Sequence, residues 1–330
     1  MNRETERLAW ARQALSHPTL QLERASTDAG FRSYWRTVGL SPSRIVMDSP
    51  PDQEDVRPWL AMRAQLASGG VRVPQVLAED AETGFLVLED LGVNTYLHDI
   101  DEANADAMFD AAIDQLLKLQ AIAPPAGLQR YDEAMLAREL RLFDDWFCGR
   151  HLGMTLDCGD METLDAAYRH LIDAALAQPQ VLVHRDFMPR NLMQAGNGPA
   201  VLDFQDAAVG PIAYDALSLF KDAFLSWPAP RVDAWLRHYH ARASAAGLPV
   251  PSLERFLRDA ELIGVQRHLK VIGIFARLHH RDGKPKYLAD TPRFFVYLDE
   301  VLPRYPQLAG LHAFIEGKVK PAILAAATPA

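Results

Sequence analysis

The spacing of apolar residues along the chain changes its character close to residue 90. Before that point, five short segments have the alternation or the apolar run of a β-strand: residues 20–25, 33–38, 44–47, 76–78 and 85–88. Apolar residues at helical spacing predict two helices in the same part, over residues 4–16 and 52–67. Gly69 and Gly70 end the second helix, as glycine often does at a helix C-terminus.

After Gly92 the apolar spacing becomes that of helices. It predicts helices over residues 105–121, 131–147 and 165–177. A compact strand–loop–strand segment follows over residues 181–209, and helical spacing returns from Ala213 onwards. This order predicts an α+β fold with two lobes, a β-rich N-lobe at residues 1–90 and a larger helical C-lobe at residues 91–330.

The composition narrows the class of protein. The chain has 330 residues, of which 49% are hydrophobic and 23% charged, as in a globular enzyme. A net charge of −9 repels phosphate backbones, so no nucleic acid partner is expected. The two cysteines lack metal-binding spacing and predict free thiols. Without a secretory leader or an apolar stretch of about 18 residues, we expect a cytoplasmic protein with no membrane partner and no obligate protein partner.

The segment from Val181 to Met193 is the richest in chemistry. An apolar strand leads into His184, Arg185 and Asp186, and Asn191 follows five positions after Asp186. A second apolar strand leads into Asp203. Phosphoryl transfer needs a carboxylate near the attacking hydroxyl, and amide and carboxylate oxygens to hold Mg²⁺ against the phosphates. We therefore expect two adjacent strands to place Asp186, Asn191 and Asp203 side by side.

These residues resemble the motifs of a known family. His184-Arg185-Asp186 with Asn191 looks like the HRDxxxxN catalytic loop of kinases, and Asp203-Phe204-Gln205 stands in the place of their DFG triplet. With the segment 211–217 they are most similar to the aminoglycoside phosphotransferase-like superfamily, although Gly210 stands where that family has its first Asp. The resemblance implies a bilobal, protein-kinase-like fold that uses ATP and Mg²⁺.

The resemblance also implies roles for the residues of the motif. Asp186 is the predicted general base, with His184 holding the loop by hydrogen bonds and Asp215 anchoring its backbone. Asn191 and Asp203 are the predicted Mg²⁺ ligands. Two further residues lie within reach of phosphate or substrate, a position that simple solvation also explains: Arg190, counted as catalytic, and Gln205, counted as substrate-binding.

The N-lobe departs from the family pattern, because no lysine precedes Lys118. Kinases of this type carry a strand Lys that pairs with the ATP phosphates, and Met47 stands near that place. Arg32 and Arg44 are the predicted replacements, with Arg36 next, although each also fits a surface charge.

The rest of the predicted nucleotide site comprises one carboxylate and two backbone segments. Glu54, which we expect to open the helix over residues 52–67, is the predicted partner of the phosphate-binding arginine. Glu89 and Leu91, after the apolar strand, mark the expected hinge that holds adenine. The usual glycine-rich loop is reduced to Ser26–Phe31, with one glycine.

The acceptor is predicted from resemblance. The segments 45–51, 85–92 and 266–278 are similar to the bacterial kinases that phosphorylate the anomeric hydroxyl of N-acetylmuramate and N-acetylglucosamine in peptidoglycan recycling. This implies an amino-sugar substrate. Arg267 is then the predicted contact of a substrate carboxylate, although such a residue also fits an arginine that extends its charge to solvent. The other predicted acceptor contacts are Asp222, Trp227 and His268.

Three other functions stay open at this point. A kinase of an aminoglycoside or amino alcohol would use the same catalytic core, but would favour an acidic acceptor pocket. A nucleotide-binding pseudokinase fits the missing Lys, but not the intact Asp186, Asn191 and Asp203. A protein kinase fits least, because no recognisable activation segment follows Asp203.

Overall fold

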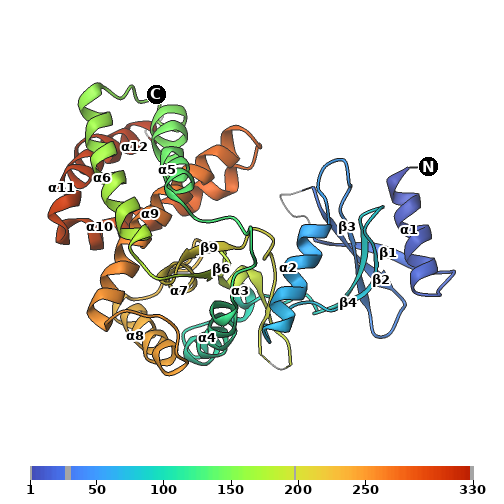
Figure 1. Cartoon of the computed structure of the whole chain (residues 1–330). Helices are drawn as coiled ribbons and strands as arrows, with labels where there is room; N and C mark the ends of the chain where they lie inside the picture. Colours follow the sequence, from blue (N-terminus) through green and yellow to red (C-terminus); the bar gives the residue numbers. More distant parts are fainter. Residues whose placement is uncertain (1, 27–30, 197, 328–330) are drawn as a thin grey trace. The chain divides into compact units, whose positions relative to one another are not determined.

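The computed structural model describes residues 2–26, 31–196 and 198–327 (Figure 1). By compactness the chain divides into two units. The first comprises Met1–Ile122 with Pro189–Ala207, and the second comprises Ala123–Met188 with Ala208–Ala330. The first unit thus extends beyond residue 90 and includes a later segment, while the lobe boundary predicted at residue 90 stays a prediction. Each unit is described by itself below.

The first unit is built on an antiparallel sheet with the strand order β1-β2-β3-β5-β4, which confirms the predicted N-terminal strands. The inner strand β5 carries four successive buried residues from Phe85 to Leu88, because helices cover both faces of the sheet. The strands are β1 (Gln21–Ser26), β2 (Ser33–Val38), β3 (Arg44–Asp48), β4 (Val76–Asp80) and β5 (Phe85–Glu89).

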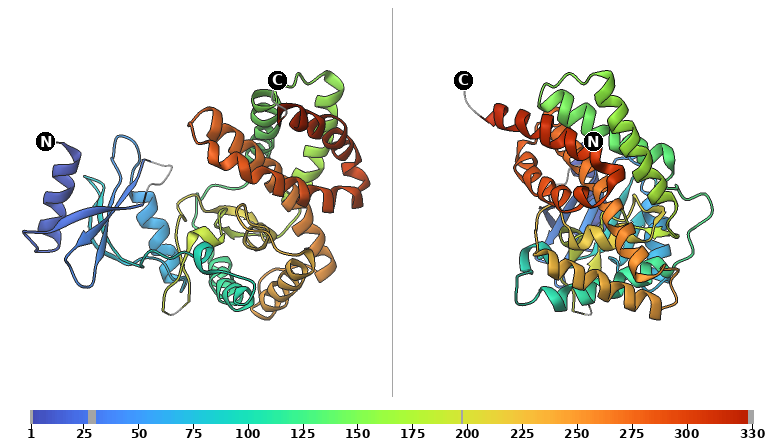
Figure 2. Two further views of the ribbon diagram at one scale, coloured as in Figure 1. Left: turned by 180° about the vertical axis from the view of Figure 1, so that it is seen from behind. Right: turned by 90° about the vertical axis from the view of Figure 1, so that its left-hand side faces the viewer.

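Helices α1 (Arg3–Ala14) and α2 (Arg57–Ser68) lie on opposite sides of this sheet (Figures 1 and 2). The Trp10 ring of α1 lies 5.6 Å from the Phe85 ring of β5. The expected start of α2 at residue 52 is wrong. Pro58 occupies the first turn of the helix, where a missing N–H costs nothing, and the preceding segment forms a turn on the Pro50 carbonyl.

The rest of the first unit supports the segment 189–207. It comprises α3 (Tyr96–Asp99), α4 (Ala105–Ala121), the 3₁₀ turn η2 (Pro189–Asn191) and the short strands β7 (Leu192–Met193) and β8 (Ala200–Val201). Strand β7 pairs with β8. The Val201 N–H donates to the Arg72 carbonyl at 2.7 Å, which ties β8 to the segment that leads into β4.

The second unit is helical around one small sheet of β6 (Gln180–Val183) and β9 (Ala208–Pro211). The predicted pairing of the strands before Asp186 and Asp203 is therefore wrong: β6 pairs with β9, and β8 pairs with β7. The reason is length, because β8 has only two residues and its neighbouring N–H groups bond elsewhere, whereas β6 and β9 match over four residues.

Helix α9 (Leu253–His280) is the longest element of the described chain and runs through the second unit (Figure 2). It contacts α5, α6, α7 and α10. Gly273 lets α9 lie close to the end of α5, since a Cβ at this position would be 2.2 Å from the carbonyl carbon of Leu142. The other helical segments are α5 (Glu133–Leu142), η1 (Phe143–His151), α6 (Cys158–Leu176), α7 (Ala213–Phe220), α8 (Ala229–Ala245), η3 (Pro285–Asp290), α10 (Thr291–Val301), η4 (Leu302–Arg304), η5 (Pro306–Leu308), α11 (Ala309–Phe314), η6 (Ile315–Val319) and α12 (Lys320–Ala327).

Two predicted helices differ from the observed ones at their ends. The helix expected from residue 131 begins at Glu133, because the Asp132 side chain accepts the Met135 N–H at 2.9 Å and caps it. It then continues as the π-helix η1. The helix expected from residue 165 begins at Cys158, where Asp157 and Asp160 form a capping box. None of the helices in the described ranges has the length and apolar character needed to cross a membrane.

Candidate active site

The loop that follows β6 is held at its backbone by one buried carboxylate. Asp215 of α7 accepts the N–H of His184 at 2.6 Å and the N–H of Arg185 at 2.9 Å. The Asp186 N–H donates to Nδ1 of His184 at 3.3 Å. Arg185 has a φ of +76°, a conformation that costs a non-glycine residue about 1 kcal/mol or more unless its surroundings hold it. The predicted role of Asp215 as the anchor of this loop is confirmed.

Burial sets the electrostatics of this anchor. Asp215 is fully buried, and burial raises its pKa from the ordinary value of 3.8 to about 6, with a smaller contribution from the charge of Asp186. The charge of His184 and the two backbone N–H groups act in the opposite direction. At neutral pH the group is therefore ionised, which suits its role as an acceptor of two N–H bonds.

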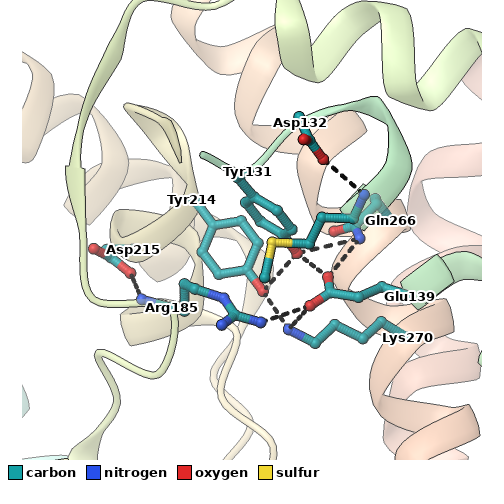
Figure 3. Close-up of polar contacts among 9 residues, drawn as sticks. Tyr131, Asp132, Glu139, Arg185, Tyr214, Asp215, Gln266 and Lys270 are labelled. Atoms are coloured by element: carbon teal, nitrogen blue, oxygen red, sulfur yellow. Dashed lines mark hydrogen bonds and ion pairs between the residues drawn. The ribbon is translucent and has the colours of Figure 1, made fainter. Parts of the chain in front are cut away.

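Side chains from three other segments of the unit converge on the carboxylate of Glu139, which lies on α5 (Figure 3). Arg185 donates to Oε1 at 2.8 Å, Lys270 lies 3.0 Å from the same oxygen, and Gln266 donates to Oε2 at 3.2 Å. The Tyr131 hydroxyl also donates to Oε2. These groups come from the segment before α5, from α5, from the catalytic loop and from α9, so a single carboxylate joins distant parts of the unit.

Charge explains why these ionisable groups stay ionised in the interior. Burial raises the pKa of Glu139, but the charges of Lys270 and Arg185 outweigh it and hold the pKa below its ordinary value. Burial is the largest single effect on Lys270 and lowers its pKa, but the charges of Glu139, Tyr214 and Asp186 together outweigh it, so the pKa lies above the ordinary value. The Lys270 ammonium also donates to the Tyr214 hydroxyl at 3.1 Å.

Lys270, one of the cations of the segment 266–278, has its acidic neighbour in Glu139. Glu139 itself was missed, together with Tyr131 and Tyr214. A signal was present, because Glu139 lies between the buried residues Leu136 and Leu140 in the apolar stripe of α5.

In the first unit, Asn191, Asp203 and Gln205 lie together. The Leu202 N–H donates to the Asn191 carbonyl at 2.9 Å, and the Asn191 amide lies 3.5 Å from Oδ2 of Asp203. Gln205 donates to Oδ1 of Asp203 at 2.7 Å. Asp203 has a φ of +61°, a left-handed conformation that aspartate tolerates better than most residues.

An aromatic contact fixes this turn. The ring of Phe204, which is fully buried, lies 5.1 Å from the ring of Trp59 on α2. In the residue that follows Phe204, Oε1 of Gln205 is buried and has no hydrogen-bond partner. Phe204 thus serves as a buried anchor, and Asp203 and Gln205 stay near the surface on either side of it.

The residues at this turn suit Mg²⁺. The donors are a carboxylate, an amide oxygen and the orphan Oε1 of Gln205, all of them the hard oxygens that Mg²⁺ prefers. In the described ranges, no three His, Cys, Asp or Glu side chains converge on a possible metal position. Phosphate and water would complete the coordination of a magnesium ion held by these few protein oxygens.

Asp186 belongs to the second unit, whereas Asn191 and Asp203 belong to the first. The convergence of the three, on which the predicted mechanism depends, therefore stays a prediction. Arg190, the other predicted catalytic residue of the loop, lies half-buried in η2, next to Asn191.

The predicted phosphate-binding arginine has the predicted partner. Arg32 is buried and forms an ion pair with Glu54. Glu54, however, precedes α2 and lies on the turn at Pro50, so its predicted place at the helix N-terminus is wrong. The reduced glycine loop at residues 26–31 lies largely outside the described residues.

The other N-lobe candidates are engaged in contacts within the first unit. Arg36 binds Asp90 through two nitrogens at 2.7 and 3.0 Å. Arg44 donates to the Ser43 carbonyl. The side chain of Glu89 forms an ion pair with Arg72, and its N–H donates to the Gln75 carbonyl. That N–H is not available to adenine. Leu91 follows β5 in an irregular segment, where the hinge was predicted.

The predicted acceptor residues of the second unit lie close enough to act on one another. The positive charge of Arg267 lowers the pKa of both Asp222 and His268, although burial raises the pKa of Asp222 overall and is the main cause of the low pKa of His268. All three are buried and have orphan polar atoms: Oδ2 of Asp222, Nη1 of Arg267 and both ring nitrogens of His268.

His268 also lines a cavity of about 340 Å³ between α7, α8, α9 and α10. Leu257, Glu261, Gly264 and His268 form its α9 wall, and Leu217 and Lys221 line it beside them. Residues two positions apart on a helix point about 200° apart, so this wall faces away from Gln266 and Lys270. The cavity is thus on the side of α9 opposite the Glu139 carboxylate.

Comparison with solved structures identifies the fold. The chain resembles a crystal structure of the aminoglycoside phosphotransferase APH(2'')-Ib with a TM-score of 0.61 at 17% identity, covering 88% of this chain and 97% of that one. It resembles a choline kinase from Cryptosporidium parvum with a TM-score of 0.63 at 10% identity, covering 97% and 98%. At such identities the likeness shows the fold, which is that of small-molecule kinases, and it confirms the predicted fold class.

Sequence comparison assigns the family. The model of the phosphotransferase enzyme family matches residues 21–257, and the chain belongs to this family, which confirms the predicted enzyme class. Two curated relatives, each named N-acetylmuramate/N-acetylglucosamine kinase, are similar over nearly the whole chain. The one from Pseudomonas putida is 54% identical over 90% of this chain and 88% of its own length. The one from Neisseria meningitidis serogroup B is 42% identical over 96% of both chains.

Proposed function

We propose that the chain transfers the terminal phosphoryl group of ATP to the anomeric hydroxyl of N-acetylmuramate and N-acetylglucosamine. The observation that carries this proposal is the similarity to relatives of that name, at 54% and 42% identity over at least 90% of the chain. A solved structure of the same fold is described as ADP-bound, which supports a nucleotide donor.

In the proposed mechanism, Asp186 accepts or orients the proton of the attacking hydroxyl. An anomeric hydroxyl is more acidic than an ordinary alcohol, which suits a carboxylate base. The loop anchored on Asp215 and Glu139 keeps Asp186 at the end of β6. Asn191, Asp203 and Gln205 would hold Mg²⁺, which supplies charge neutralisation of the phosphates when bound.

ATP and the amino sugar are assigned to different groups of residues. Arg32, oriented by Glu54, binds phosphate as the replacement of the missing lysine, and the backbone near Leu91 receives adenine. Arg190 contributes a second positive charge in the loop. The buried set of Asp222, Arg267 and His268 recognises the amino sugar, with Arg267 facing the carboxylate that N-acetylmuramate has and N-acetylglucosamine lacks.

The test is ATP consumption with four acceptors: the two amino sugars, choline and an aminoglycoside. We expect turnover with the amino sugars only, and ³¹P NMR should identify a sugar 1-phosphate. Turnover with choline or the aminoglycoside, and none with the sugars, would refute the proposed acceptor. Asp186→Asn should lower kcat at least about 100-fold with little change in ATP affinity. Asp165→Asn, on the exposed surface of α6, is the matched control and should leave kcat unchanged.

A further inference from the structure

Four donors surround the carboxylate of Glu139, and two of them are cations, one more than its charge requires. Two cations, Arg185 and Lys270, lie within 3.0 Å of the same oxygen, with side-chain exposures of 15% and 8%. Two neutral donors, Tyr131 and Gln266, occupy the other oxygen. One carboxylate faces two cations, so this group of charges by itself carries an excess of one positive charge.

The excess charge has a counterpart in the adjacent loop residue. The negative charge of Asp186 acts on the Lys270 ammonium and favours its charged form. With Asp186 included, two carboxylates face two cations, and the charges balance.

Arg185 is held at two points, its backbone N–H and its guanidinium. Arg185 has a left-handed φ of +76° and precedes Asp186 directly. Its N–H is fixed by the Asp215 carboxylate at 2.9 Å, and its guanidinium is fixed by Glu139 at 2.8 Å. A strained backbone conformation persists only where its surroundings over-determine it. The direction in which Asp186 leaves the chain therefore depends on Glu139.

Stability alone is a weak reason for this arrangement. Buried ion pairs are often replaceable by apolar residues of similar volume without loss of stability, because desolvation offsets most of the attraction. The side chains of Glu139 and Lys270 come from α5 and α9, which already pack closely at Gly273. A charged cluster at this point contributes orientation that apolar packing would not.

We propose that Glu139 and Lys270 are positioning residues that hold Arg185, and through it Asp186, in the geometry needed for phosphoryl transfer. The inference rests on the proposed role of Asp186. Neither residue has to touch the substrate or the nucleotide. Glu139 fixes the guanidinium, and Lys270 keeps Glu139 ionised while its charge faces Asp186.

Two variants and a control test this inference. Lys270→Met leaves Glu139 and Arg185 as a balanced pair, whereas Glu139→Gln leaves two buried cations without their carboxylate. Asp144→Asn is the control. Asp144 is equally buried on the neighbouring η1, and it binds an arginine at 2.8 Å and a tyrosine at 3.3 Å, but it has no contact with the loop.

The first measurement is steady-state kinetics with ATP and both amino sugars, below the thermal unfolding transition of every variant. A misplacement of about 1 Å lowers a rate on the order of 100-fold, so we expect that loss in kcat for Glu139→Gln and at least about tenfold for Lys270→Met. KM for ATP should stay within about twofold, because neither residue is placed at the nucleotide. Asp144→Asn should lose thermal stability without a change in kcat.

The second measurement, hydrogen exchange, is independent of turnover. Exchange at residues 184–187 should accelerate in both variants and stay unchanged in the control, relative to peptides from the core of the same unit. A wild-type protein inactive on both sugars would refute the proposed function, while the exchange result would still decide the positioning role. If Glu139→Gln does not fold, Lys270→Met decides. A folded Lys270→Met variant with wild-type kcat and wild-type exchange would overturn the inference.

Discussion

Asp215→Asn separates the stability of the fold from the geometry of the catalytic loop. In the wild-type protein the buried carboxylate accepts two backbone N–H bonds, at 2.6 and 2.9 Å. Asparagine has nearly the same shape, but its single oxygen accepts at most one of these bonds well, and its NH₂ group faces the other N–H. Arg185 then loses part of the restraint on its left-handed backbone.

The effect on stability at pH 7 is the sum of two opposing contributions. A pKa raised from 3.8 to about 6 means that the fold disfavours the ionised carboxylate by about 3 kcal/mol relative to the unfolded chain. Asparagine removes this cost. This net cost already includes the two N–H bonds to the carboxylate. The offsetting loss is the buried N–H that faces the NH₂ group of asparagine and stays unsatisfied, at about 1–3 kcal/mol. We expect the free energy of unfolding to change by less than about 2 kcal/mol at pH 7.

The pH dependence has a defined sign. Because the pKa of Asp215 is higher in the folded than in the unfolded protein, the folded state binds more protons between about pH 3 and pH 7. The contribution of Asp215 to stability therefore rises as the pH falls from 7 to 5, by about 1.3 kcal/mol. The asparagine variant lacks this contribution, so the variant should be less stable relative to the wild type at pH 5 than at pH 7, by that amount.

The assay is urea unfolding of both proteins at pH 5 and pH 7, together with kcat at pH 7. We expect kcat to fall about 100-fold through loss of loop geometry, even though stability at pH 7 is nearly kept. A stability difference that is the same at both pH values would refute the raised pKa of Asp215. A folded variant with wild-type kcat would refute the anchoring of the catalytic loop by this carboxylate.

Three further predictions address the nucleotide, the acceptor and the fold. Arg32→Ala should raise KM for ATP at least about tenfold, as expected for a lost bond to phosphate, without a matching change for the sugar. Arg57→Ala, which removes an exposed ion pair at the first residue of α2, is the control, and equal effects would remove Arg32 from the nucleotide site. Arg267→Met should raise KM about tenfold for N-acetylmuramate but not for N-acetylglucosamine, and equal losses for both sugars would argue against a carboxylate contact. Gly273→Ala should lower the free energy of unfolding by at least about 1–3 kcal/mol, because the new Cβ would meet the backbone of α5 at 2.2 Å. Gly264→Ala should cost less in the same urea titration, since its nearest contact is a mobile leucine methyl at 2.8 Å, and the reverse order would contradict the close packing of α5 on α9.

The catalytic motifs were accessible to sequence reasoning because they are local. His184, Asp186 and Asn191 lie within eight residues, and their spacing reflects one loop. The anchoring role of Asp215 was predicted from the family resemblance, and its two backbone N–H bonds confirm it. The partnership of Arg32 and Glu54 was also predicted, since a cation that approaches phosphate needs a carboxylate to orient it.

The strand pairing was predicted wrongly for a physical reason. Two apolar segments that precede catalytic aspartates look equivalent in sequence. Only one of them, β6, has a partner of matching length in β9, and β8 is too short to compete. The start of α2 was missed because the turn at Pro50 and the proline at the helix start outweigh the apolar spacing of the preceding residues.

The sequence by itself determined the class of chemistry, because a phosphotransferase needs particular oxygens at particular spacings along one loop. The tertiary structure alone decided what surrounds that loop. Glu139, Arg185 and Lys270 stand far apart in the chain, and no periodicity relates them. They meet because α5 and α9 pack at Gly273, and because a buried carboxylate must find cations wherever the fold places them.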